Sequence, residues 1–202
     1  MRQQSPAFFS HRRLPIRRVF FILFEIIVMR FGMHGYVQVY TGNGKGKTTA
    51  ALGLALRALG AGIRVFFGQF LKCGEYSELA ALKKFGEAIQ IRQFGRPEFV
   101  ITPGEEDREA ARRGLLAAME AVSSGDYGLV ILDEACMAAH LGLISVRDLL
   151  ELAARKRGET ELVFTGRYCP VMLLERADLV TEMLEVKHYF HAGIKARKGI
   201  EE

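Results

Sequence analysis

The stretch Thr41-Gly42-Asn43-Gly44-Lys45-Gly46-Lys47-Thr48-Thr49 follows an apolar run at 36–40 and precedes an Ala/Leu-rich run at 50–59. The first run is typical of a β-strand and the second of an α-helix, so the glycine-rich stretch is predicted to be the loop between them. Glycine lets a loop turn its N–H groups toward an anion, and the N-terminus of the following helix favours negative charge. The sequence therefore predicts a phosphate-binding loop that holds a nucleoside triphosphate.

The side chains of this loop suit a phosphate ligand. We expect Lys47 to reach phosphate oxygens and the Thr48 hydroxyl to ligate Mg²⁺. The residues predicted to bind the nucleotide within the loop are Gly42, Asn43, Gly44, Lys45, Gly46, Lys47, Thr48 and Thr49. The usual pattern, G-x-x-x-x-G-K-[ST], has a glycine where this chain has Thr41. The alternative is an ordinary glycine-rich turn before a helix, which agrees less well with the sequence Gly-Lys-Thr-Thr and a preceding strand.

The composition is that of a globular chain of 202 residues, 50% of them hydrophobic and 25% charged. The first 32 residues contain six of the 28 basic residues and one of the 23 acidic ones, so the remainder has no net charge. A dedicated nucleic-acid surface is therefore not expected. The three cysteines, Cys73, Cys136 and Cys169, form no C-x-x-C pair and suit a reducing compartment, so we expect a cytoplasmic protein.

Residues 1–32 differ from the rest of the chain and are interpreted as an N-terminal extension, with the phosphate-loop domain predicted at 33–202. Their apolar stretch at 19–29 is too short to span a membrane and is interrupted by Glu25, so stable membrane insertion is not expected. No small-residue cleavage site follows it, as a secretory signal would require. An amphipathic surface helix and an upstream extension of a protein that starts near Met33 are both open alternatives.

Strand and helix patterns alternate along the rest of the chain. Strands are predicted at 64–71, 88–94, 128–133 and 161–166, with a last short strand within 179–186. Helices are predicted at 77–85, 105–122 and 146–157, and a helical turn at 171–175. Ser77 and Ser145 are the predicted N-caps of two of these helices, and the segment 95–104 is predicted to be a loop. This alternation predicts a three-layer α/β/α fold like that of the P-loop NTPases of RecA type, with a mainly parallel sheet.

Two acids close a buried strand pattern. Asp133 and Glu134 follow the apolar segment at 128–132. Because the carboxyl ends of parallel strands meet at one edge of a sheet, we expect both acids beside the phosphate loop, where they would hold Mg²⁺ together with Thr48. The alternative for Asp133 is a helix cap. Glu134 has two open roles, as a base that activates water in a hydrolase or as a group that tunes the metal site.

Other candidate residues carry weaker signals when each is taken alone. Arg167 follows the strand predicted at 161–166 and could neutralise charge on a phosphate leaving group, although a surface ion pair is the alternative. Arg57 lies on the helix after the loop, where most arginines are solvated. His188 and His191 have the spacing of a metal pair, but the sequence shows no third ligand for them.

Taken together, these segments resemble the P-loop class of ATP:corrinoid adenosyltransferases, which act on cob(I)alamin or cob(I)yrinic acid a,c-diamide. The resemblance covers 35–201 and depends on the segments 40–50, 132–134, 165–167, 177–182, 187–188 and 193–201. The loop sequence Thr-Gly-Asn-Gly-Lys-Gly-Lys-Thr is specific to that family and accounts for the missing first glycine. The chain departs from the family at Tyr189, where proline is usual, and at Cys136-Met137. Phe94 and Phe99 flank a loop that could present an aromatic ring to a flat ligand, with core packing as the alternative.

The resemblance implies a reaction in which Co(I) of a reduced corrinoid attacks C5′ of ATP and displaces triphosphate, in adenosylcobalamin biosynthesis or salvage. ATP and the corrinoid are then substrates, Mg²⁺ is the metal, and a flavoprotein is the expected reductant. Family members are often dimers, so a homodimer is an open alternative. The family also binds ATP along the loop in the reverse direction, which suits chemistry at the ribose end.

The resemblance also assigns residues. The expected catalytic residues are Lys47, Glu134 and Arg167, and the expected metal ligands are Thr48, Asp133 and Glu134. Arg57 and Arg167 match family positions near the nucleotide, so Arg57 joins the residues expected to bind ATP.

Two other functions are open from the sequence. The first is a P-loop ATPase or kinase, in which Glu134 or another base activates water or a hydroxyl group and the product is phosphate or ADP. The second is a corrinoid carrier without catalytic activity, which would use ATP only as a signal for release. The phosphorus product separates the adenosyltransferase from both.

A shortened chain that starts at Met33 should fold and turn over corrinoid as well as the full chain does, if residues 1–32 are an upstream extension. Activity assays and ATP titrations on the two chains test this expectation. A large loss of corrinoid turnover with ATP affinity retained would instead make residues 1–32 a cover of the active site.

Overall fold

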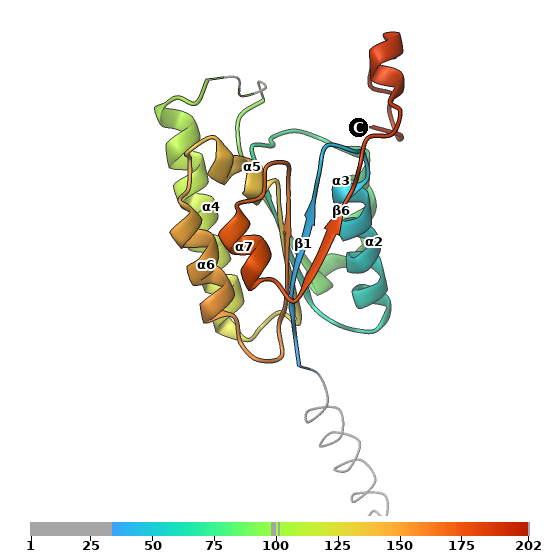
Figure 1. The fold of residues 1–202 in the computed structure, drawn as a ribbon. Coiled ribbons are helices and arrows are strands. Elements are labelled where there is room, and N and C mark those ends of the chain that lie inside the picture. The colour runs from blue at the N-terminus through green and yellow to red at the C-terminus, as the bar shows by residue number, and fades with distance from the viewer. Residues whose placement is uncertain (1–33, 98–99, 101, 202) are drawn as a thin grey trace, which may run out of the picture. The chain divides into compact units, whose positions relative to one another are not determined.

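The computed structural model describes residues 34–97, 100 and 102–201, which form a three-layer α/β/α fold (Figure 1). The middle layer is a six-stranded sheet with the strand order β3-β2-β4-β5-β1-β6, and every strand pair is parallel. The strands are β1 (Val37–Thr41), β2 (Val65–Phe70), β3 (Ile89–Phe94), β4 (Leu129–Asp133), β5 (Glu161–Thr165) and β6 (Leu179–Glu182). The prediction of an α/β fold with a mainly parallel sheet is confirmed.

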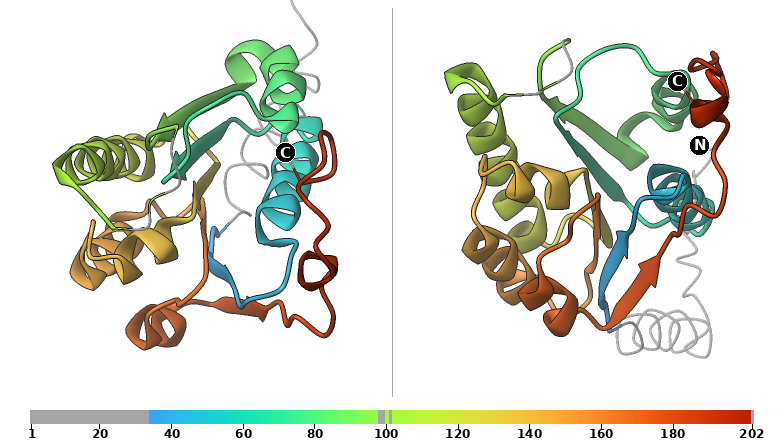
Figure 2. Two further views of the ribbon diagram at one scale, coloured as in Figure 1. Left: turned by 90° about the horizontal axis from the view of Figure 1, so that it is seen from above. Right: turned by 45° about the horizontal axis from the view of Figure 1, so that its top comes forward.

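Helices cover both faces of the sheet, as two further views show (Figure 2). One face carries α2 (Lys47–Gly60) and α3 (Ser77–Leu82), and the other carries α4 (Glu105–Ser124), α5 (Ala135–His140), α6 (Val146–Arg155) and α7 (Val171–Arg176). Two 3₁₀ helices, η1 (Lys83–Ala88) and η2 (Tyr189–Ala192), follow α3 and β6. Each helical layer closes its own hydrophobic cluster against the sheet.

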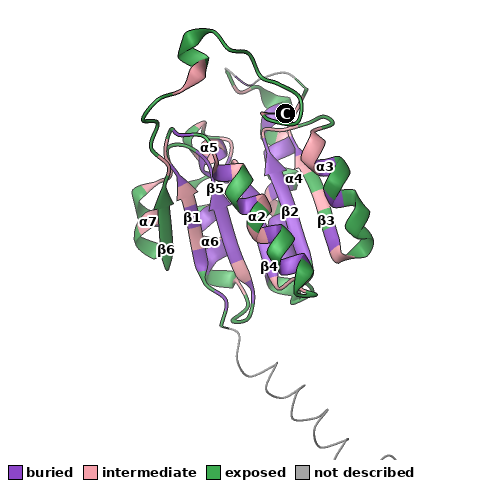
Figure 3. Ribbon diagram, turned by 90° about the vertical axis from the view of Figure 1, so that its right-hand side faces the viewer, coloured by how far each residue is buried: buried purple, intermediate pink, exposed green. Residues whose placement is uncertain are grey.

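The central strands are buried on both faces, whereas one edge of the sheet is exposed (Figure 3). All residues of β2 and β4 are buried, which explains why their sequences are mostly apolar and do not alternate. All four residues of β6 are exposed. The hydrophobic core therefore lies on both faces of β2, β4, β5 and β1. Buried polar residues at the ends of these strands are candidates for function.

The strand order determines which strand ends meet. β5 lies between β1, which leads into the glycine-rich loop, and β4, which ends in Asp133. Because all strands run in the same direction, their carboxyl ends share one edge of the sheet. The loop after β1, Asp133 and the end of β5 at Thr165 are therefore brought together at that edge.

Most predicted elements are confirmed, with differences at their ends. Ser145 caps α6 as predicted, since its hydroxyl accepts a hydrogen bond from the N–H three residues later at 3.1 Å. The prediction for Ser77 is wrong, because Ser77 is the first residue of α3 and Tyr76 occupies the N-cap position. The α-helix also stops at Leu82 and continues as η1, inside which Gly86 has a φ of 57°.

One helix has no counterpart in the sequence predictions. The helix α5 is only six residues long and starts directly after Glu134, without a side-chain cap. Such a short apolar run gives no helical periodicity to recognise. The short strand predicted within 179–186 is confirmed as β6, which ends at Glu182.

Several expectations concern the surface and the termini. No helix in the described part of the chain has the length and apolar character needed to cross a membrane. Cys73, Cys136 and Cys169 are free thiols. The predictions for residues 1–32 and for Phe99 lie outside the described residues.

Two helical glycines allow a matched test of the packing between α4 and the sheet. A Cβ on Gly114 would lie 2.7 Å from Phe70 and 2.9 Å from Phe94, whereas a Cβ on Gly53 of α2 would meet nothing within 4 Å. Gly114→Ala should therefore lower the free energy of unfolding by about 1–3 kcal/mol through overpacking. Gly53→Ala should raise it by about 0.5–1 kcal/mol through helix propensity. Urea unfolding measures both, and a Gly114→Ala protein as stable as the parent would contradict this packing.

Candidate active site

The phosphate loop joins β1 to α2 and packs against the residues that follow β6. Gly42 and Gly46 have φ angles of 94° and 121°, which favour glycine. A Cβ on Gly42 would lie 2.4 Å from the carbonyl oxygen of Met183, and the N–H of Gly44 donates to that same oxygen at 2.7 Å. Gly42 and Gly44 therefore also leave room for the chain after β6 to pass close to the loop. The sequence alone did not predict this contact.

Lys47 is buried at the start of α2 with its side chain inside the loop. Its Nζ donates to the carbonyl oxygens of Gly42 at 2.7 Å and Gly44 at 2.8 Å. Burial lowers the pKa of Lys47, while the nearby carboxylate of Glu134 opposes this shift. The loop thus holds an ammonium group at its centre, where a phosphate would need it.

Asp133, at the end of β4, is the fully buried centre of a polar network. Its Oδ1 accepts hydrogen bonds from the hydroxyls of Thr165 at 2.6 Å and Thr48 at 2.9 Å. Its Oδ2 accepts from Lys72 Nζ at 2.8 Å and from Gln69 Nε2 at 3.2 Å. The structure places Asp133 beside Thr48, as expected, and Asp133 is not a helix cap, because the residue after it is the N-cap of α5.

Lys72 is a charged residue of this network that the sequence analysis missed. Its Nζ lies 3.5 Å from Thr48 Oγ1 as well as 2.8 Å from Asp133, and it lies 5.7 Å from the ring centroid of Tyr76. Burial opposes the charge on Lys72, but the ion pair with Asp133 outweighs burial, so the pKa of Lys72 is raised. The available signal was its position just beyond the buried strand β2, at the same sheet edge as Asp133.

Glu134 has a φ of 58°, in the left-handed region that few non-glycine residues adopt. Its N–H donates to the Thr165 hydroxyl at 3.0 Å, which holds the backbone in this turn. Burial raises the pKa of Glu134, and the adjacent charge of Asp133 raises it further. Glu134 is therefore a partly desolvated carboxyl group at the edge of the site.

Two cavities share Glu134 and Arg167 as lining residues. The first, called the phosphate cavity below, has a volume of about 350 Å³. Its lining residues are Gly44, Lys45, Gly46, Lys47, Thr48, Thr49, Glu134, Arg167, His188, Ile200 and Glu201. The second, called the apolar cavity below, has a volume of about 420 Å³ and is lined by Leu71, Lys72, Tyr76, Val100, Glu134, Met137, Leu141 and Arg167. The site can therefore hold a polyanion and a largely apolar ligand side by side.

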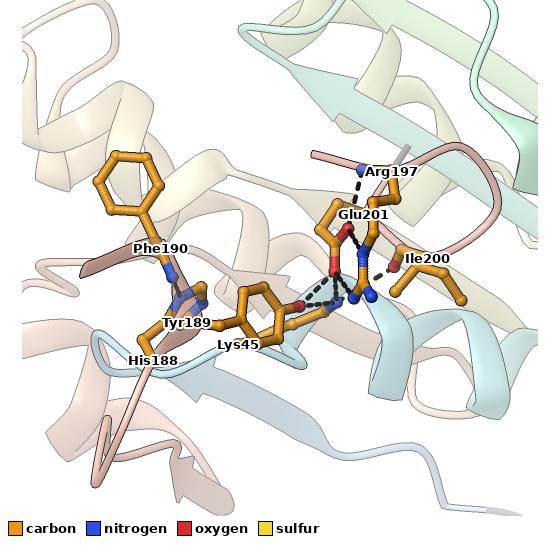
Figure 4. Close-up of polar contacts among 7 residues, drawn as sticks. All are labelled: Lys45, His188, Tyr189, Phe190, Arg197, Ile200 and Glu201. Atoms are coloured by element: carbon orange, nitrogen blue, oxygen red, sulfur yellow. Dashed lines mark hydrogen bonds and ion pairs between the residues drawn. The ribbon is translucent and has the colours of Figure 1, made fainter. Parts of the chain in front are cut away.

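The C-terminal residues close one side of the phosphate cavity (Figure 4). Lys45 Nζ donates to the Tyr189 hydroxyl at 2.9 Å, to the Ile200 carbonyl oxygen at 3.2 Å and to Glu201 Oε1 at 2.7 Å. Arg197 also donates to Glu201, from its backbone N–H at 2.9 Å and from its guanidinium group. The hydrogen bonds from Arg197 and then from Lys45 hold the pKa of Glu201 far below its usual range.

The predicted nucleotide-binding residues do not all lie at the phosphate cavity. The residues from Gly44 to Thr49 line it, whereas Gly42 and Asn43 do not. Arg57 is exposed in the last turn of α2, about 15 Å along the helix axis from Lys47 at the rise of an α-helix. The structure therefore brings Arg167 to the cavity but leaves Arg57 away from it.

The histidine and aromatic candidates have other partners. His191 Nε2 lies 2.6 Å from Glu185, and His188 Nδ1 accepts from the N–H of Phe190. No group of three or more His, Cys, Asp or Glu side chains in the described residues could hold a metal ion. Phe94 is buried, with its ring centroid 5.8 Å from that of Phe70, so core packing explains it.

This arrangement of a phosphate loop, a buried strand-end acid and an adjoining apolar cavity agrees with the sequence comparison. A sequence model of the family described as ATP:corrinoid adenosyltransferase BtuR/CobO/CobP matches residues 33–201. The chain belongs to this family. The match includes both cavities and the C-terminal residues around Glu201, so the whole site lies within the region that defines the adenosyltransferase family.

Curated relatives support the same assignment. The chain is 35% identical to a corrinoid adenosyltransferase of Pseudomonas aeruginosa, in a match that covers 98% of each chain. It is 34% identical to the corrinoid adenosyltransferase of Escherichia coli, covering 83% of this chain and 85% of that one. Corrinoid adenosyltransferase CobA of Salmonella typhimurium gives the same three values. The Pseudomonas aeruginosa match extends into the N-terminal residues that the family model leaves out.

A solved structure has a similar fold. The flagellar accessory protein FlaH from Methanocaldococcus jannaschii matches with a TM-score of 0.52, covering 78% of this chain and 76% of that one. At 15% sequence identity, this likeness concerns the fold alone. It confirms the P-loop NTPase-like fold of the adenosyltransferase.

The ion pair between Lys72 and Asp133 should be a large contributor to the stability of the adenosyltransferase. Lys72→Met leaves the fully buried Asp133 carboxylate without its cation, so it should lower the free energy of unfolding by about 3 kcal/mol. Adding Asp133→Asn removes the unpaired charge, and the double variant should be less destabilised than the sum of the single variants. Chemical unfolding of all four proteins measures this coupling. Lys84→Met, at an exposed lysine of η1, is the control and should change stability by less than about 0.5 kcal/mol.

Proposed function

We propose that this enzyme transfers the 5′-deoxyadenosyl group of ATP to Co(I) of a reduced corrinoid and releases triphosphate, in adenosylcobalamin biosynthesis or salvage. Membership of the ATP:corrinoid adenosyltransferase family supports ATP and a corrinoid as the substrates. The observation that carries the proposal is the shared wall of Glu134 and Arg167 between the phosphate cavity and the apolar cavity. A transfer between ATP and a large, partly apolar acceptor needs two adjoining sites of this kind.

The phosphate cavity is proposed to hold the triphosphate as the leaving group. Lys47 lies inside the loop and Arg167 lies at the junction of the two cavities. Negative charge builds on the triphosphate as the bond to C5′ breaks, and both cations would stabilise it in a partly desolvated site. Lys47 and Arg167 are therefore proposed as catalytic residues. The nucleotide role of Arg57 stays a prediction that this geometry does not support.

Mg²⁺ is proposed to bind together with the triphosphate at Thr48, Asp133 and Glu134. The donor set fits, because hydroxyl and carboxylate oxygens are the ligands that Mg²⁺ prefers, and phosphate oxygens complete its coordination. The Lys72 ammonium, 2.8 Å from Asp133, shows that this carboxylate already attracts a cation. When bound, the metal would neutralise part of the charge on the triphosphate.

The apolar cavity is proposed to receive an edge of the corrin ring. Leu71, Val100, Met137 and Leu141 give it apolar walls, and Tyr76 is the aromatic side chain that faces it among the described residues. Its position next to Glu134 and Arg167 would place the cobalt near the ribose end of ATP. Burial of the reacting atoms between the two cavities would also keep water from the Co(I) centre.

The proposed step requires positioning rather than proton transfer. The electron pair of Co(I) forms a bond to C5′, the C5′–O bond breaks, and the electron pair of that bond leaves with the triphosphate. No proton moves, so no general base is needed. The chain's contribution is to hold C5′ and the cobalt in line and to stabilise the leaving group.

Partners and location follow from the same proposal. The resemblance supports a flavoprotein that supplies Co(I), and it supports a homodimer as one arrangement of the enzyme. Absence of a basic excess outside the first 32 residues supports an enzyme without a nucleic-acid partner. Three free cysteines support a cytoplasmic location.

A P-loop ATPase is the alternative function, and Glu134 is the observation that favours it. This carboxyl group lines the phosphate cavity, and its raised pKa would suit a base that activates water. The alternative predicts steady release of orthophosphate from ATP without a corrinoid. The adenosyltransferase proposal predicts no such release.

The phosphorus product and Glu134→Gln together separate the two functions. With Mg-ATP and chemically reduced corrinoid, the unmutated enzyme should form triphosphate in step with the cobalt–carbon bond, and only when the corrinoid is present. Glu134→Gln keeps an oxygen ligand but loses its charge, so turnover should fall roughly 10- to 100-fold and recover in part at higher Mg²⁺. Phosphorus NMR and the corrinoid absorption spectrum measure both. Orthophosphate release without corrinoid, abolished by Glu134→Gln at every Mg²⁺ concentration, would favour the ATPase.

A further inference from the structure

The carboxylate of Glu201 lies in the phosphate cavity, where a negative charge is unexpected. Glu201 and Ile200 line this cavity together with the loop residues from Gly44 to Thr49. An anion at that place repels a triphosphate unless cations hold it. The structure shows such cations, because Lys45 and Arg197 both donate to Glu201 (Figure 4).

The groups around Glu201 form the kind of donor set that proteins use for phosphate. Lys45 Nζ lies 2.7 Å from Oε1, and the Arg197 guanidinium lies 3.1 Å from Oε1 and 3.2 Å from Oε2. The Arg197 backbone N–H donates to Oε2 at 2.9 Å, and the Tyr189 hydroxyl donates to Oε1. An ammonium, a guanidinium, a hydroxyl and a backbone N–H bind a phosphate group as readily as a carboxylate.

We propose that Lys45, Tyr189 and Arg197 form a subsite for a phosphate group of the triphosphate, and that Glu201 occupies this subsite until ATP binds. This inference depends on the proposed function, in which the phosphate loop holds the triphosphate. It adds Tyr189 and Arg197 to the nucleotide site and makes Glu201 an internal anion that the nucleotide displaces.

The backbone near Glu201 allows this side chain to leave the phosphate cavity when a ligand binds. Between η2 and Glu201 the described residues form only turns and irregular structure. Gly193 and Gly199 have φ angles of 79° and 76°, and nothing lies within 4 Å of a Cβ on either. Gly199 lies between Arg197 and Glu201, so a rotation there moves the Glu201 carboxylate away from Lys45 and Arg197 and breaks no helix or strand.

The opposite possibility is that Glu201 is a permanent clasp that keeps the cavity wall in place. The two possibilities predict opposite effects of Glu201→Gln, which keeps the size of the side chain and removes its charge. If Glu201 competes with phosphate, the variant should bind triphosphate more tightly. If Glu201 is a clasp, the variant should bind it equally well or more weakly.

The test uses the full chain, without corrinoid, and isothermal titration calorimetry with inorganic triphosphate and with ATP in the presence of Mg²⁺. Glu201→Gln should tighten the binding of both ligands by roughly three- to tenfold, because no internal anion has to be displaced. Arg197→Gln should weaken binding, and in the Arg197→Gln background Glu201→Gln should give a smaller gain. Glu185→Gln is the matched control, since it removes an acid between β6 and η2 that does not line the cavity, and it should change affinity by less than about twofold.

Each outcome has a distinct meaning, provided that thermal melting shows the variants to be folded. Unchanged or weaker binding by Glu201→Gln, or an equal gain from Glu185→Gln, would overturn the inference. Lys47→Ala tests the proposed function separately, because it removes the ammonium at the centre of the loop. Triphosphate binding unaffected by Lys47→Ala would overturn the phosphate site, and the inference with it. Weakened binding by Lys47→Ala without a gain from Glu201→Gln would overturn the inference alone.

Discussion

The buried carboxylate of Asp133 is the group on which the rest of the site depends. A carboxylate with no exposed surface needs hydrogen bonds and a cation, and four side chains from β2, α2, β5 and the segment after β2 supply them. Through these contacts the carboxylate ties the phosphate loop to the end of β4. The position of the loop relative to the two cavities is therefore set by satisfying one buried charge.

Charged side chains of the protein form ion pairs at two places in the site, around Asp133 and around Glu201. Lys72 supplies a cation to Asp133, and Glu201 supplies an anion to Lys45 and Arg197. Each of these partners has the charge of a group that Mg-ATP is proposed to bring. The buried Asp133 carboxylate would be costly without its cation, whereas the two ion pairs of Glu201 are partly exposed and contribute less. Under the proposed function, ligand binding replaces one set of ion pairs by another.

Sequence patterns predicted the parts of this structure that depend on neighbours in the chain. The phosphate loop, the buried strand before Asp133 and the Ser145 cap are all local, because periodicity, glycine content and capping residues determine them. The prediction for Ser77 is wrong by one residue, because the sequence pattern of a serine at the N-cap does not differ from that of a serine in the first helical turn. The six-residue helix α5 could not be predicted, because so short a run shows no helical periodicity.

What the sequence could not predict was pairing between residues that are far apart in the chain. Lys72 and Asp133 are separated by 61 residues, and Lys45 and Glu201 by 156. Neither pair has a local pattern, so only the strand order and the path of the C-terminal segment bring them together. Arg57 shows the reverse case. It lies close to the loop in sequence, yet ten residues of helix carry it away from the phosphate cavity.

The junction between the two cavities depends on a backbone turn that is unfavourable in isolation. Glu134 adopts a left-handed conformation, which costs about 1–3 kcal/mol for a residue with a side chain. This turn ends β4 abruptly and starts α5, whose first residues pack under Gly166, where a Cβ would lie 2.9 Å from the N of Met137. Because Gly166 lies so close to α5, the next residue, Arg167, is brought to the cavities that Glu134 also lines. The strain at Glu134 is thus the condition for placing a carboxylate and a guanidinium at the boundary between the phosphate cavity and the apolar cavity.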